Sequence, residues 1–131
     1  FRGTNVVHMG DVFFHGRYPF IDVGSGGSID GMIRAAERVY ERINDETTII
    51  PGHGPLATRA DLAAYIADLK AMRGAVNALI DRGLDRGAAI TAKPLAPFEE
   101  RLGGGFLNGD VVTGILWDSL SGGADPAAAG D

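Results

Sequence analysis

Apolar and β-branched residues mark two short strands in the first half of the chain. The segment NVVHMGD (5–11) combines β-branched residues with an abrupt polar end, which predicts a strand that ends at Gly10 and Asp11. The run TTII (47–50) predicts a second strand, terminated by Pro51. A helical segment separates the two. This strand–helix–strand order predicts an α/β fold with a right-handed crossover.

Apolar residues at helical spacing predict four helices. They fall at 32–43, 62–80, 86–92 and 109–120, with a loop between the last two. Ser28 and Asn108 are candidate N-caps, and Thr58 opens a Thr-x-x-Asp capping signal. Gly83 is a natural helix stop. Residues 121–131 are small and polar and predict a frayed tail.

Composition narrows the class of protein. Apolar residues make up 45% of the 131, enough for one packed domain or part of a larger one. The net charge of -5 and the lack of a basic stripe argue against nucleic acid or an anionic membrane as a partner. No apolar run approaches the roughly 20 residues that span a bilayer. The absence of cysteine excludes thiolate metal sites and fits a reducing cytosol.

Two residues with metal-binding chemistry follow the predicted strands. Asp11 ends the first strand, and His53 stands after the second in the stiff sequence PGHGP. Functional residues collect at the carboxyl ends of strands in such sheets, so both side chains are expected at one edge. A carboxylate with a neutral imidazole suits zinc, iron or manganese. Taken singly, His53 is more typical of an ordinary surface or hydrogen-bonding position, and Asp11 of a turn or capping position.

The order of these elements resembles a known family. NVVHMGD, a helix after a glycine-rich turn, and TTIIPGHGP before a long helix are similar to the second half of a metallo-β-lactamase-fold hydrolase, over roughly residues 5–80. The resemblance implies a four-layer αββα sandwich, of which residues 1–120 would form the helix-rich C-terminal half. It implies that Asp11 bridges two divalent ions, here zinc, as a catalytic residue, and that His53 ligates the second ion.

The resemblance also implies an activity. A metal-bound hydroxide would attack a carbonyl carbon or a phosphorus in a small-molecule substrate. Members of the family act on thioesters, lactams, lactones, sulfur compounds and phosphodiesters, and nothing in this sequence selects among them. His15, Arg17 and Tyr18, in the aromatic-rich segment after the first strand, are candidates for substrate contact. His15 equally suits capping of local backbone, and His8 suits a structural or supporting role.

The leading metal motif of that family, His-x-His-x-Asp-His, does not occur in this chain. A catalytic zinc usually has three protein ligands, so two would form a weak site. We therefore expect the C-terminal part of a longer protein, inactive or nearly so as it stands. A missing N-terminal half or a second copy would complete it. The alternative is a non-catalytic α/β module that dimerises and keeps Asp11 and His53 as relics.

Overall fold

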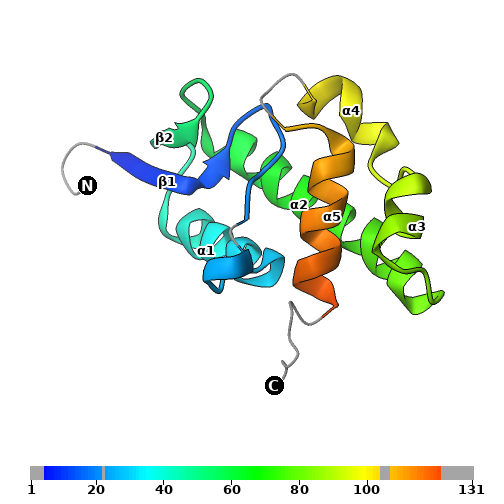
Figure 1. Ribbon diagram of the computed structural model, residues 1–131. Helices are drawn as coiled ribbons and strands as arrows, with labels where there is room; N and C mark the ends of the chain where they lie inside the picture. The colour runs from blue at the N-terminus through cyan, green and yellow to red at the C-terminus, as the bar shows by residue number, and fades with distance from the viewer. Residues whose placement is uncertain (1–4, 22, 104–106, 122–131) are drawn as a thin grey trace.

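The chain forms a mixed α/β structure with a small parallel sheet. The computed structural model describes residues 5–21, 23–103 and 107–121, apart from the side chains of Asp11, Ser25 and His53. The elements in order are β1 (Val6–Phe14), a 3-10 turn η1 (Val23–Ser25), α1 (Ile29–Arg42), β2 (Thr48–His53), α2 (Arg59–Asp81), α3 (Arg86–Thr91), α4 (Ala96–Leu102) and α5 (Gly109–Leu120) (Figure 1). Of the predicted tail 121–131, residues 122–131 lie outside the described residues.

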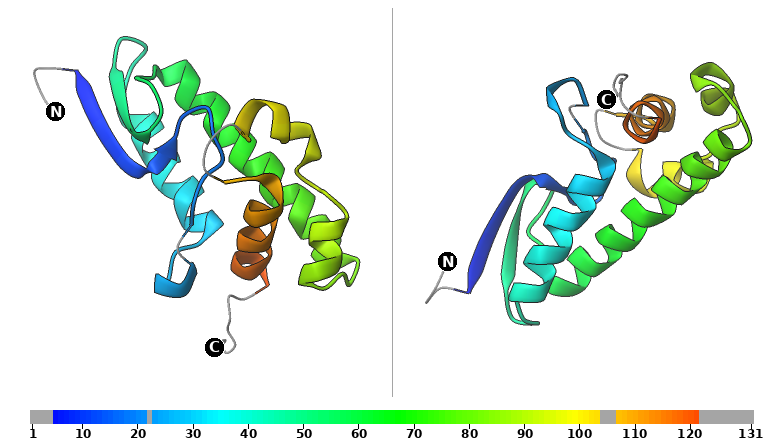
Figure 2. Two further views of the ribbon diagram at one scale, coloured as in Figure 1. Left: turned by 45° about the horizontal axis from the view of Figure 1, so that its top comes forward. Right: turned by 90° about the horizontal axis from the view of Figure 1, so that it is seen from below.

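The two strands pair in parallel, as the strand–helix–strand order predicted. Val7 lies beside Ile49 in the register. Ile49 is fully buried, whereas its neighbours Thr48 and Ile50 are only half-buried, so alternate residues face opposite sides of the sheet. Both α1 and α2 lie on one side of the strand pair, and no described helix covers the other side (Figure 2).

Both strands extend beyond their predicted ends. β1 continues to Phe14 because Gly10 adopts a φ of +58° and the register shifts between His8 and Gly10, which forms a β-bulge instead of a stop. β2 continues through Pro51, which pairs with Gly10. A proline is compatible with this strand because a two-stranded sheet leaves each strand one edge outside the hydrogen-bond ladder.

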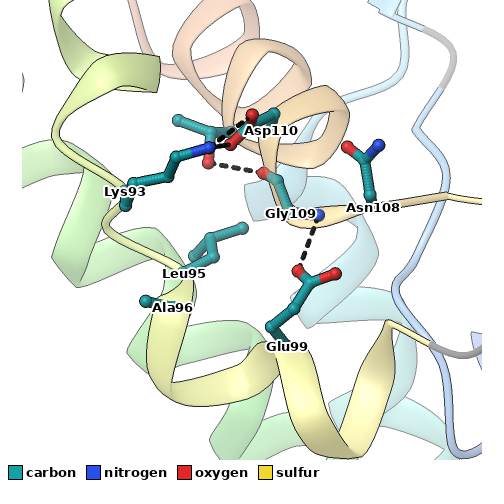
Figure 3. A pocket seen from close by; sticks show the side chains of 8 residues that line it. Lys93, Leu95, Ala96, Glu99, Asn108, Gly109 and Asp110 are labelled. Carbon is teal, nitrogen blue, oxygen red and sulfur yellow. Dashed lines mark hydrogen bonds and ion pairs between the residues drawn. The ribbon is translucent and has the colours of Figure 1, made fainter.

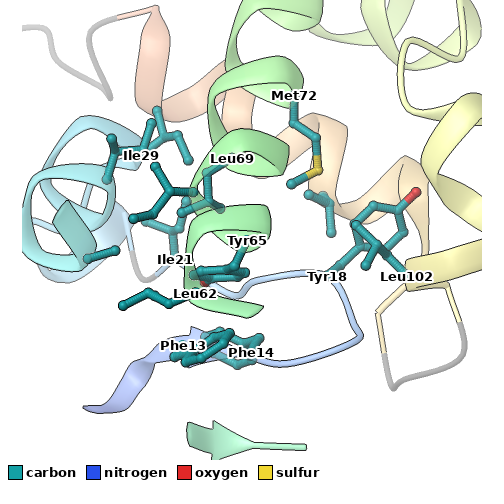
Figure 4. Packing of buried hydrophobic residues seen from close by; sticks show 14 of the residues in the cluster. Phe13, Phe14, Tyr18, Ile21, Ile29, Leu62, Tyr65, Leu69, Met72 and Leu102 are labelled. Atoms are coloured by element: carbon teal, nitrogen blue, oxygen red, sulfur yellow. The ribbon is translucent and has the colours of Figure 1, made fainter. Parts of the chain in front are cut away.

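The hydrophobic core joins the sheet to the helices. Figure 4 shows aromatic residues of β1 and of the following loop meeting the buried stripe of α2. The largest fully buried side chains include Phe13, Tyr18, Ile29, Leu62, Leu69, Met72 and Leu116. α5 packs against both α2 and α3 (Figure 1).

Most predicted helix ends are confirmed. Ser28, Thr58 and Asn108 accept N-cap hydrogen bonds from backbone N–H groups, and Gly83 has a φ of +86° at the end of α2. The loop predicted between the last two helices is wrong, because α4 occupies much of it. Its proline lies in the first turn, where a missing N–H costs no helical hydrogen bond. None of the described helices is both long and apolar enough to cross a bilayer.

Candidate functional site

The parallel pairing brings the backbones of Asp11 and His53 to neighbouring places on adjacent strands. Gly10 is the register partner of Pro51. Asp11 is one residue beyond Gly10, and His53 is two residues beyond Pro51. The prediction that Asp11 follows the end of a strand is wrong, because it lies within β1 directly after the bulge. His53 is the last residue of β2, where it pairs with Phe14. Their side chains lie outside the described part of the structure.

The turn that carries His53 is closed by backbone hydrogen bonds. Ile49 and Ala57 form an isolated antiparallel bridge, with N–O distances of 2.8 and 2.9 Å in the two directions. Gly54 inside this turn has a φ of +103°, a conformation that favours glycine. A Cβ atom on Gly54 would lie 2.3 Å from the carbonyl oxygen of His15. The turn, defined here as residues 51–57, therefore packs its backbone directly on the residue that follows β1.

His15 makes a second connection to the turn through its side chain. Its Nδ1 donates a hydrogen bond to the carbonyl oxygen of Pro55 at 2.9 Å. Its Nε2 lies 3.9 Å from Oδ2 of Asp61, in the first turn of α2. Neither partner is close to His15 in sequence, so local patterns could not reveal these contacts. Among the three histidines, His15 is the one that the structure shows touching the His53 turn.

His8 makes a hydrogen bond within β1, the strand that carries Asp11. Its Nδ1 accepts a hydrogen bond from the backbone N–H of Gly10 at 3.0 Å, and the His8 side chain is exposed. This contact supports the bulge that precedes Asp11. The observation agrees with the structural role considered for His8 from the sequence.

A pocket of about 260 Å³ lies beside His15. It lies between the end of β1 with the two residues that follow, the N-terminal half of α2 and the end of α4. The lining residues are Phe13, Phe14, His15, Gly16, Asp61, Ala64, Tyr65, Asp68, Arg101 and Leu102. Arg101 forms two hydrogen bonds of 3.1 Å with Asp68. These bonds and the charge of Asp68 raise the pKa of the Arg101 guanidinium. With that pair neutralised, Asp61 leaves the pocket with a net negative charge.

The other two residues proposed for substrate contact differ in their surroundings. Arg17 is half-buried, and its Nε is buried without a hydrogen-bond partner among the described residues. Tyr18 is 1% exposed, and its hydroxyl donates to the carbonyl oxygen of Leu95 at 3.2 Å and to Glu99 at 3.1 Å. Burial and the Glu99 carboxylate raise the pKa of Tyr18 above its usual value. Tyr18 therefore joins the β1 loop to α4.

A second pocket, of about 390 Å³, lies between α4 and the start of α5 (Figure 3). Its charged groups already bind one another. Lys93 contacts Asp110 at 2.7 Å, and Glu99 accepts from the N–H of Gly109 at 2.9 Å. Asn108 accepts a hydrogen bond from the N–H of Val111, and the Thr113 hydroxyl donates to the carbonyl oxygen of Gly109. These contacts stabilise the junction between α4 and α5. None of the residues that line this pocket was predicted from the sequence to be a catalytic or binding residue.

The residue types of Asp11 and His53 are ones that bind divalent metals. A carboxylate and an imidazole on adjacent strands suit zinc. Among the described side chains, no three His, Cys, Asp or Glu residues gather closely enough to hold a metal ion. Two residues fall short of the three protein ligands usual for catalytic zinc. No protein-family model and no characterised protein matches the chain.

Proposed function

We propose that this chain is part of a metal-dependent hydrolase and contributes Asp11 and His53 to its zinc site. The observation that carries the proposal is the parallel pairing of β1 with β2, which puts the two backbones at neighbouring positions. Each residue also stands next to a glycine with positive φ, Gly10 or Gly54. Bulges and tight turns of this kind are frequent at functional sites because they re-aim side chains.

The wider architecture would be the αββα sandwich that the sequence resembles, completed by segments outside this chain. Parallel sheets occur almost only with both faces covered, and a sheet of two strands is marginal alone. Here both α1 and α2 lie on the same side of the sheet (Figure 2). A further layer on the opposite side is therefore the arrangement that we expect in the complete enzyme, together with the remaining metal ligands.

The proposed chemistry is hydrolysis of a small-molecule substrate. Zinc in such a site supplies Lewis acidity and lowers the pKa of a water towards roughly 7. Asp11 would hold the ions as the catalytic carboxylate, and His53 would hold the second one. The Nε of Arg17 has no partner among the described residues and is the kind of donor that an anionic substrate oxygen would satisfy. His15 lines the pocket in which a substrate would lie, and Tyr18 would hold the loop after β1 against α4.

Metal titration of the 131-residue chain tests the proposal. We expect measurable Zn²⁺ binding by calorimetry, weakened about tenfold or more by Asp11→Asn and by His53→Ala, which corresponds to roughly 1.4 kcal/mol or more. The matched control is Asp45→Asn, because Asp45 is an exposed carboxylate just before β2, at the opposite end of that strand from His53. Equal Zn²⁺ affinity in all four proteins contradicts the assignment.

A second candidate function is a non-catalytic module that dimerises. The side of the two-stranded sheet that no described helix covers favours it (Figure 2). Leu56 favours it too, because it is 64% exposed next to Ala57, which forms a bridge with Ile49 of β2. We expect such a module to be a dimer in light scattering and to bind no stoichiometric zinc. Leu56→Ser would then shift the dimer towards monomer.

A further inference from the structure

We propose that His15 is a positioning residue that fixes the His53 turn in place, a role distinct from substrate contact. The inference rests on the proposed function only in its consequence for metal binding. The contact itself belongs to the structure of the chain. His15 directly follows β1, so it couples the strand that carries Asp11 to the turn that carries His53.

Contacts of the backbone and of the side chain hold the turn against His15. Phe14, the preceding residue, pairs with His53 in the sheet. The carbonyl oxygen of His15 lies where a side chain on Gly54 would be, so the two backbones are in close contact. The imidazole Nδ1 then donates to Pro55 at 2.9 Å. His53 thus pairs with Phe14, and the two residues that follow it, Gly54 and Pro55, contact His15.

Contacts between aromatic rings hold the imidazole of His15 in place. The ring of Phe13, which is fully buried, lies 5.4 Å from the His15 ring and 4.7 Å from the Tyr65 ring between centroids. The Tyr65 hydroxyl donates to Val12 at 2.8 Å, which ties α2 to β1. A donor supported in this way loses little entropy when it bonds to the turn.

The hydrogen bond to Pro55 determines which residue types can replace His15. The Pro55 carbonyl can only accept, so Nδ1 of His15 must carry the proton. The amide nitrogen of an asparagine occupies nearly the place of Nδ1 and also donates. A phenylalanine keeps the ring but donates nothing. Asparagine should therefore replace His15 in this role, and phenylalanine should not.

The experiment compares His15→Asn, His15→Phe and wild type in the full chain by ¹⁵N relaxation of the Gly52, His53 and Gly54 amides. In wild type we expect order parameters near about 0.85, typical of rigid backbone, and in His15→Phe a fall towards about 0.6. His15→Asn should retain the wild-type values. Asp118→Asn is the control, because it weakens the ion pair with Arg86 on the helical side of the molecule.

Zn²⁺ titration of the same proteins separates this inference from the proposed function. Supporting residues of metal ligands typically contribute about 10- to 100-fold in affinity, and we expect a loss in that range for His15→Phe with recovery in His15→Asn. Unchanged turn order in His15→Phe overturns the inference. A disordered turn in His15→Phe, with no Zn²⁺ bound even by wild type, supports the positioning role and refutes the metal site.

Discussion

Replacement of Gly54 by alanine tests the close approach between the His53 turn and β1. The φ of +103° at Gly54 is unfavourable for any residue with a side chain, at a cost of about 1–2 kcal/mol. The added Cβ would also lie 2.3 Å from the backbone oxygen of His15, which no rotamer change can relieve. Forced repacking of this kind costs about 1–3 kcal/mol. We expect Gly54→Ala to lower the free energy of unfolding by about 2–5 kcal/mol.

Two other glycines separate the two contributions. Gly16 has a φ of +78° but open space where a Cβ atom would lie, so Gly16→Ala should cost only the backbone strain of about 1–2 kcal/mol. Gly74 lies in α2 with nothing within 4 Å of the same position, so Gly74→Ala should stabilise the chain by about 0.5–1 kcal/mol.

Urea unfolding followed by circular dichroism at 222 nm measures all three glycine variants under one set of conditions. The difference between Gly54→Ala and Gly16→Ala isolates the contact with His15. If the two variants agree within about 0.5 kcal/mol, the turn does not pack on β1 as described, and the positioning role of His15 loses its basis. The order Gly54, Gly16, Gly74 from most to least destabilising is the result that the geometry requires.

Variants at three further residues test the core, a helix cap and a buried phenol. Leu69→Ala should cost about 2–5 kcal/mol in urea unfolding, because Leu69 is fully buried in the core. Thr58→Ala should cost about 1 kcal/mol by losing the capping box with Asp61, whereas Thr58→Ser should retain most of it. Burial raises the pKa of Tyr65 above its ordinary 10.0, so above pH 10 the unfolded chain releases a proton that the folded chain keeps. Stability should therefore fall with rising pH there, by up to about 1.4 kcal/mol per pH unit from this group, and more shallowly in Tyr65→Phe. Equal slopes in the two proteins would contradict this account.

Local sequence signals were sufficient for most elements because their causes are local. Helical spacing of apolar residues and the caps at Ser28, Thr58 and Asn108 act within a few residues, and all three caps form as predicted. The α4 helix was missed because prolines and glycines are typical of loops, although a proline is also favourable in the first turn of a helix. The pattern also indicated the parallel strand pair that brings Asp11 and His53 to adjacent strands.

The tertiary structure alone decided how the candidate site is supported. The bulge at Gly10 carries β1 past Asp11, and nothing in NVVHMGD distinguishes a bulging glycine from one that ends a strand. The contacts of His15 with Gly54 and Pro55 join residues about 40 positions apart. Such contacts exist only after the sheet has formed, because the pairing of Phe14 with His53 sets the distance between them. Residue types therefore determined the available chemistry, and the packing of the two strand ends determined which side chains can assist it.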